Sequence, residues 1–189
     1  MKFKMNRAFR EASGELDGLV YRVQRGKVVV SRKPDLTNVD YSENQIAHRE
    51  RFKKATVYGR SVMANPTQRA LYQTAADERD LPIFAVTIAD YFNLPIIHEV
   101  DLSAYNGHVG SHITINATDD FSVKNVHVSL TNSGGMPLEN GDAVETSSGS
   151  GIWVYNAKFN VPADTLVTVR VVATDNPGGA SVQEVTKQF

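Results

Sequence analysis

The chain has 189 residues, a formal net charge of −1, a hydrophobic content of 41% and no cysteine. This composition is sufficient for a packed core and argues against a wholly disordered chain. The absence of cysteine excludes disulfides, thiolate metal sites and a cysteine nucleophile.

Charge is unevenly distributed along the chain. Residues 1–94 carry 16 Lys and Arg against 11 Asp and Glu, whereas residues 95–189 carry 4 against 10. The change coincides with residues 93–95, where helical periodicity gives way to strand-like alternation. Modules of opposite charge attract one another between copies, so the pattern favours head-to-tail self-association.

Residues 1–15 are predicted to form a basic arm, and the sequence leaves open whether this arm is ordered in isolation. It contains no apolar stretch like that of a secretory signal, so we expect the chain to be made in the cytoplasm. The final location, extracellular or on a particle, is left open. No stretch of the sequence is long and apolar enough for a membrane span.

Residues 16–94 are predicted to form a β-hairpin followed by two or three helices. In residues 16–33, Leu19, Tyr21 and Val23 alternate with polar neighbours, and residues 25–27 provide a turn before residues 28–30 return. Such a hairpin is marginal alone. It must therefore pack on the helices, join the second module or pair with another copy.

Helix start signals follow the hairpin. Ser42 and Gln45 have the spacing of a capping box, and Asn65 before Pro66 predicts a second helix start. The spacing of apolar residues predicts inner faces made of Ile46, Phe52, Ala55, Gly59, Val62 and Met63 on the first helix, and of Ala70, Leu71, Thr74 and Ala75 on the second. Residues 83–92 suit either a third helix or a buried strand, and we favour a helix.

Residues 95–189 alternate with a period of two and predict an immunoglobulin-like β-sandwich of seven strands. The expected strands are residues 96–102, 112–117, 123–131, 143–147, 152–159, 166–174 and 181–187. The inward positions are expected at Ile113, Ile115, Ala117, Val126, Val128, Leu130, Val167, Val169, Val171 and Ala173. The predicted fold class is therefore an α+β N-terminal region followed by an all-β sandwich.

Two stretches of this half, residues 115–128 and 171–179, resemble bacterial immunoglobulin-like and cadherin-like modules, a resemblance that covers residues 96–189. It implies a sandwich and a surface, adhesion or virion-decoration context. The N-terminal half, in residues 18–34, 42–45 and 49–52, is similar to uncharacterised bacterial and phage-associated proteins.

The cadherin-like resemblance also suggests calcium ligands, because acidic residues lie at strand ends. The set that it implies is Asp119, Asp120, Asp175 and Asn176. Calcium requires six to eight oxygen ligands. The competing interpretation, that these side chains cap turns through their own backbone, is favoured. Apart from calcium, no cofactor is expected.

Trp153 and Tyr155 alternate on one strand and suggest an exposed platform for a glycan, although a lone Trp in a sandwich is more often a core residue. No nucleophile elbow, helical zinc motif, phosphate loop or dinucleotide fingerprint is present, so no catalytic residue is assigned and a non-enzymatic protein is expected.

The leading hypothesis is a structural protein that self-associates into a filament, sheath or virion-like assembly. The expected contacts between copies are Lys2, Arg7, Arg10, Val20, Arg22, Val28, Val29 and Val30 on one side, and Asp119, Asp120 and Glu139 on the other. One alternative is a glycan- or protein-binding module for adhesion or decoration. Another is a nucleic-acid packaging protein that uses the basic half.

Overall fold

The computed structural model describes residues 13–24, 27–35 and 40–189, and its chain divides into two compact units, Met1–Ile46 and Ala47–Phe189. The described residues contain three helices and three antiparallel sheets. None of these helices is long and apolar enough to cross a membrane.

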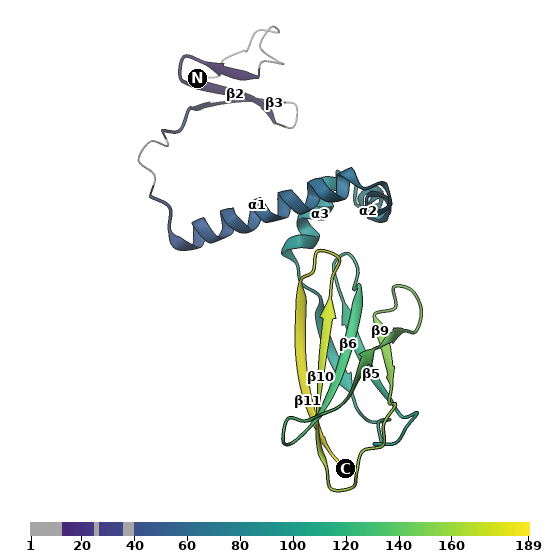
Figure 1. Cartoon of the computed structure of the whole chain (residues 1–189). Helices are drawn as coiled ribbons and strands as arrows, with labels where there is room; N and C mark the ends of the chain where they lie inside the picture. The colour runs from purple at the N-terminus through teal and green to yellow at the C-terminus, as the bar shows by residue number, and fades with distance from the viewer. Residues whose placement is uncertain (1–12, 25–26, 36–39) are drawn as a thin grey trace. The chain divides into compact units, whose positions relative to one another are not determined.

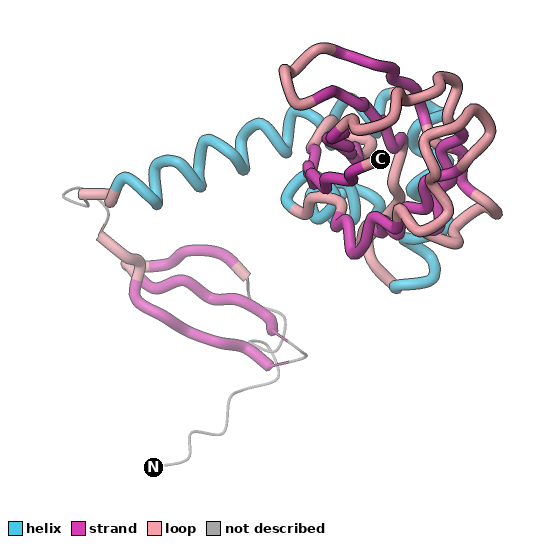
Figure 2. Tube along the Cα trace, turned by 90° about the horizontal axis from the view of Figure 1, so that it is seen from below, coloured by secondary structure: helices cyan, strands magenta, loops and turns pink. Residues whose placement is uncertain are grey.

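The first unit contains a three-stranded antiparallel sheet with the order β1-β2-β3 (Figures 1 and 2). Its strands are β1 (Gly14–Leu16), β2 (Leu19–Gln24) and β3 (Lys27–Arg32). The predicted hairpin corresponds to β2 and β3, whereas β1 was not predicted. The turn at residues 25 and 26 lies outside the described residues.

A tight turn at Asp17 and Gly18 explains β1. Both residues have positive φ, 50° and 73°, and the strands pair directly on either side of them, Leu16 with Leu19. Positive φ at both central positions defines the type I′ hairpin turn, for which Asp-Gly is a preferred sequence. The sequence signal for this turn was present and was missed.

Three helices follow: α1 (Glu43–Ala64), α2 (Pro66–Arg79) and α3 (Ile83–Phe92). The capping box is confirmed, because the Ser42 backbone N–H donates to Gln45 Oε1 at 2.9 Å and the Gln45 N–H donates to Ser42 Oγ at 3.4 Å. Asn65 caps α2 by accepting from the N–H groups of Thr67 and Gln68. Residues 83–92 are helical, as favoured.

The predicted inner faces of the helices need correction. On α1, Ala55, Gly59 and Val62 are buried, but Ile46, Phe52 and Met63 are exposed. On α2 the buried residues are Tyr72 and Ala76, while Leu71 is 57% exposed. The helices share a small core of Val62, Tyr72, Ala76 and Val86.

Residues 96–188 form two four-stranded antiparallel sheets, with the orders β11-β10-β6-β7 and β4-β5-β9-β8. The strands are β4 (Ile96–Asp101), β5 (His112–Thr118), β6 (Asn125–Asn132), β7 (Pro137–Asp142), β8 (Val144–Glu145), β9 (Ile152–Asn156), β10 (Leu166–Thr174) and β11 (Ala180–Gln188). The described part of this region therefore has eight strands. The sequence predicted seven, and the strand that it did not predict is β7.

One hydrophobic core contains buried residues from both sheets, which makes the region a β-sandwich. All ten predicted inward residues are buried in it. Their alternation is visible on β10, where Val169 and Val171 are buried and Arg170 between them is exposed. The strand register deduced from the sequence is thus confirmed for the central strands.

Candidate functional site

A cluster of carboxylates lies where α3 meets the end of the sandwich. Asp90 is on α3, and Asp119 and Asp120 follow β5. One carboxylate oxygen from each of these three residues lies within 4.8 Å of the other two. Asp175 follows β10 and interacts with this cluster electrostatically. The charge of Asp175 raises the pKa of Asp90, and the charge of Asp119 raises the pKa of Asp175.

Tyrosines hold Asp90 in place. The Tyr72 hydroxyl donates a hydrogen bond to Asp90 Oδ2, and the same hydroxyl lies 2.7 Å from the hydroxyl of Tyr58. Phe121, from the loop that carries Asp119 and Asp120, stacks on the Tyr72 ring with centroids 4.1 Å apart. The Asp90 side chain is therefore fixed by α1, α2 and the β5–β6 loop together.

Backbone N–H groups orient two of the other acids. Asp119 Oδ2 accepts from the N–H groups of Phe121 and Ser122 at 3.2 and 3.1 Å. Asp175 Oδ1 accepts from those of Gly178 and Gly179 at 2.7 and 2.5 Å. Each acid thus caps its own loop with one oxygen, as the turn interpretation predicted.

Asp120 ties the sandwich to the helices. Its backbone carbonyl accepts a hydrogen bond from Arg79 Nη2, at the end of α2. Its Oδ2 accepts from Asn93 Nδ2, just after α3, at 2.9 Å. These contacts bring the β5–β6 loop against the helices.

Burial and mutual repulsion raise the pKa values of the cluster. Burial, reinforced by the charges of Asp119, Asp175 and Asp120, raises the pKa of Asp90 to about 7, against the opposing effect of the Tyr72 hydrogen bond. The pKa values of Asp119 and Asp175 are also raised, chiefly by burial. The ionised forms are thus disfavoured at this site unless a positive charge accompanies them.

The implied calcium set and the observed cluster overlap in part. Asp119 and Asp120 belong to the cluster, whereas Asp175 and Asn176 do not. The Asn176 amide instead donates a hydrogen bond to Ser122 Oγ at 2.8 Å. Asp90 was missed. Its signal was available, because it is the only charged residue in the apolar segment of α3.

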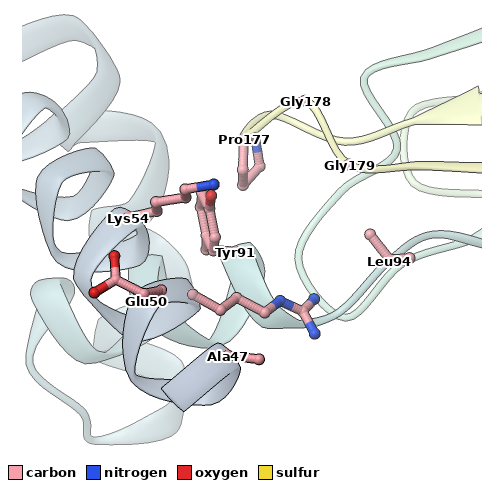
Figure 3. A pocket seen from close by; sticks show the side chains of 9 residues that line it. Ala47, Glu50, Lys54, Tyr91, Leu94, Pro177, Gly178 and Gly179 are labelled. Carbon is pink, nitrogen blue, oxygen red and sulfur yellow. The ribbon is translucent and has the colours of Figure 1, made fainter. Parts of the chain in front are cut away.

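The second unit has one cleft at Asp119 and another at the 177–179 loop. One, of about 370 Å³, opens at Asp119 and includes Phe121, Ser122 and Glu145 in its walls. The other, of about 350 Å³, has Lys54 and Tyr91 extending toward the 177–179 loop, with Glu50 also in its wall (Figure 3). Two basic side chains, Arg51 and Lys54, and one acidic side chain, Glu50, line the second cleft, so its lining has a net positive charge.

The remaining predicted sandwich residues are not free on the surface. Trp153 and Tyr155 are 7% and 1% exposed and belong to the core, as the favoured interpretation had it, so they form no aromatic platform. Glu139 is not in a loop but on β7. Its Oε2 accepts from the Tyr155 hydroxyl and from the Lys158 N–H. It pairs with Leu130 and so lies away from Asp119 and Asp120, which precede the start of β6.

The sheet of the first unit has two different faces. Residues directly opposite in an antiparallel pair share a face, and the pairs Leu16–Leu19, Tyr21–Val30 and Val23–Val28 place six large hydrophobic side chains together. We call this set, Leu16, Leu19, Tyr21, Val23, Val28 and Val30, the apolar face; Arg32, which pairs with Leu19, lies on the same side of the sheet. The opposite face carries Glu15, Val20, Arg22, Gln24, Lys27, Val29 and Ser31.

The predicted assembly contacts are therefore divided. Val28 and Val30 are on the apolar face, whereas Val20, Arg22 and Val29 are on the opposite one. Lys2, Arg7 and Arg10 lie outside the described residues. None of the described residues of this unit is buried, and Leu16, Val23 and Val30 are 67%, 47% and 45% exposed.

No protein-family model and no curated protein matches the chain. Among solved structures, CopC from Methylosinus trichosporium OB3b is similar over 49% of this chain and 89% of its own, with 12% identity and a TM-score of 0.36. A bromine derivative of BhCBM56 is similar over 44% and 85%, with 18% identity and a TM-score of 0.31. An engineered protein, of which this chain spans 26%, has 20% identity and a TM-score of 0.31. Similarities at this level identify neither a family nor a ligand.

Proposed function

We propose that this protein is a non-enzymatic structural subunit that self-associates through its N-terminal sheet into a filament, sheath or virion-like assembly. The observation that carries the proposal is the apolar face of that sheet, on which Leu16, Val23 and Val30 are exposed and the other three residues are half-buried. All six of its residues lie in a unit in which no described residue is buried.

An isolated sheet of this kind lacks the stabilisation that sheets normally have. Short strands need a hydrophobic face packed on another layer to be stable. Burial contributes about 25 cal/mol for each Å² of apolar surface removed from water. The first unit obtains little of this contribution in the described residues, so a covering surface would stabilise both its strands and the contact.

Charge favours a second copy of the chain as the covering surface. The half that contains the sheet has an excess of Lys and Arg, and the half that contains the sandwich has an excess of Asp and Glu. Every copy therefore has one positively and one negatively charged half, which supports contacts that repeat from copy to copy. The acidic partner surface excludes Glu139, whose carboxylate is bonded within its own sandwich.

The sandwich is, in this proposal, an immunoglobulin-like module that forms the body of the subunit. Two antiparallel four-stranded sheets around one core support this assignment. In such a subunit, the sandwich would fold alone and the N-terminal sheet would become fully stable on assembly.

Two neighbouring valines provide a matched test. Val30 lies on the apolar face and Val29 on the opposite face of the same strand, and they are 45% and 38% exposed. Sedimentation velocity of the full chain at low salt should show oligomers. Val30→Lys should shift these strongly toward the monomer because it places a charge in the contact, whereas Val29→Lys should shift them little.

Two results would overturn the proposal. One is a full-length chain that stays monomeric at high concentration and low salt, which would mean that the chain covers its own apolar face. The other is an equal effect of the two lysine variants, which would mean that the apolar face is not the contact.

A further inference from the structure

We propose that Asp90, Asp119 and Asp120 bind a calcium ion, with Asp175 adding negative charge beside them. The proposal is independent of self-association. It rests on the clustering of oxygen ligands, on buried carboxylate oxygens without partners, and on a route from solvent.

Each of three acids uses one oxygen and leaves the other free. Tyr72 binds Oδ2 of Asp90, and backbone N–H groups bind Oδ2 of Asp119 and Oδ1 of Asp175. The remaining oxygens, Asp90 Oδ1, Asp119 Oδ1 and Asp175 Oδ2, are buried without a hydrogen-bond partner among the described residues.

Such oxygens are unusual because buried polar groups nearly always have a partner. Asp90 and Asp175 are 0% and 1% exposed, so water in the bulk does not solvate them. The hydrogen bonds to their other oxygens also fix both carboxylates in place. A cation bound by the clustered acids would satisfy the free oxygens of Asp90 and Asp119 without any rearrangement of the hydrogen bonds that these two side chains already make.

The cluster also lacks compensating charge. None of the ion pairs between described residues involves Asp90, Asp119, Asp120 or Asp175. Arg79 is near, but its hydrogen bond goes to the backbone carbonyl of Asp120. Like charges at this spacing oppose one another's ionisation, and a divalent cation would relieve that repulsion.

The ligand chemistry favours calcium over other cations. The clustered groups are all carboxylates, with no His or Cys among them, which suits a hard cation. Calcium accepts six to eight oxygens in flexible geometry, whereas magnesium requires a near-ideal octahedron and retains several waters. The three carboxylates come from separate segments, one from α3 and two from the β5–β6 loop, and this arrangement suits the less demanding ion.

The site has an access route and a structural consequence. Asp119 lines the cleft of about 370 Å³, through which an ion and its remaining waters can reach the cluster. Asp90 belongs to α3, and Asp119 and Asp120 belong to the β5–β6 loop. A bound calcium ion would therefore link α3 to the β5–β6 loop and stabilise the contact between the helices and the sandwich.

The test uses the full chain after removal of metals with a chelator. Isothermal titration calorimetry with calcium chloride near neutral pH should show one ion per chain, and about 1 mM calcium, the range of weak extracellular sites, should raise the melting temperature. Asp119→Asn should weaken binding about tenfold or more, because it removes an ionised ligand. Asp142→Asn, at an exposed acid that bonds Asn125 and His127, is the matched control and should bind as the wild type does.

Measurements on the wild type keep the proposal testable even where a variant folds poorly. A folded wild-type chain that shows neither binding heat nor a change in melting temperature with calcium would overturn it. Equal binding of magnesium would overturn the choice of calcium, and an equal loss in Asp142→Asn would overturn the location.

Discussion

The Tyr72 hydroxyl donates a hydrogen bond to Asp90 Oδ2, and through this contact the packing of the helices depends on the acidic cluster. Tyr72 also contacts Tyr58 on α1 and stacks on Phe121 from the sandwich. One side chain thus joins all three helices to the β5–β6 loop. Its size and polarity both contribute.

Tyr72→Phe should destabilise the second unit by about 1–3 kcal/mol, the usual cost of leaving a buried polar group without its hydrogen-bond partner. The substitution keeps the ring that stacks on Phe121 but leaves Asp90 without its donor. Urea denaturation followed by circular dichroism would measure the change.

The control for this prediction is Tyr91→Phe, on α3. The Tyr91 ring packs against Tyr58 and Phe92, and no hydrogen bond of its hydroxyl is seen within the described part of the chain. The control should therefore change the free energy of unfolding little. Equal losses in the two variants would show that the Tyr72 hydroxyl contributes nothing specific.

The raised pKa of Asp90 predicts a pH dependence of stability in a chelating buffer. Its pKa is about 7 in the folded chain and near 3.8 otherwise, so the folded state holds the proton more tightly between these values. Stability should therefore fall as the pH rises from about 4 to about 7 and then level off. Asp119 and Asp175, whose pKa values are also raised, contribute in the same direction.

Asp90→Asn isolates the contribution of Asp90, because it removes the titrating group and keeps an oxygen that can accept from Tyr72. Thermal melts across this pH range should show a flatter profile for the variant and a higher stability than the wild type above about pH 7. Parallel profiles for the two proteins would contradict the assignment.

The sequence predicts part of the acidic cluster but not Asp90. Asp119, Asp120 and Asp175 were found because they lie at strand ends, where local patterns are informative. Asp90 is brought to them by the packing of α3 on the sandwich, which no local pattern encodes. A single acid within ten otherwise uncharged residues was the available sign of a special role.

Gly59→Ala should destabilise the protein although alanine is the better helix former by about 1 kcal/mol. A Cβ atom at Gly59 would lie 2.8 Å from both Phe84 Cε2 and Thr87 Oγ1, on α3. Thermal denaturation should show a lower melting temperature for this variant. Val57→Ala, at a site that is 62% exposed on the same helix, should leave it nearly unchanged. A stabilised Gly59→Ala protein would mean that α1 and α3 do not approach so closely.

Val128→Asp tests the strand register of the sandwich. Val128 is 0% exposed at the centre of the core, so an unpaired carboxylate there should cost several kcal/mol in desolvation and unfold the region. Val182→Asp, on β11 with 50% exposure, should cost little. Near-ultraviolet circular dichroism and melting would show the difference. Unchanged melting of Val128→Asp would refute the register.

The central strands were predictable and the edges were not. Residues of β6 and β10 alternate strictly because one face of each is fully buried, and a shift by one residue would expose that face. Strand β7 has the sequence Pro-Leu-Glu-Asn-Gly-Asp at a sheet edge, without β-branched residues, so its pairing with β6 has no strong local signal. The inner face of α2 was misassigned because Tyr72 is fixed by Asp90 and Phe121, which are distant in sequence.

Deleting residues 1–15 should weaken self-association without unfolding the second unit. The deletion removes basic residues and all of β1 except Leu16, including Glu15, which pairs with Lys33 at 2.9 Å. The second unit should keep its melting temperature because its two hydrophobic cores contain no residue of the first unit.

Salt dependence identifies how charge takes part in the same contact. At about 1 M salt the Debye length is about 3 Å, so attraction between the basic and acidic halves should be screened and sedimentation should shift toward smaller species. Contacts of the apolar face are not screened in this way, so some association should persist in the full chain. The truncated protein should show less association at low salt and a weaker response to added salt, since part of the basic charge is gone. If the two proteins respond to salt identically, the basic N-terminal residues take no part in the contact.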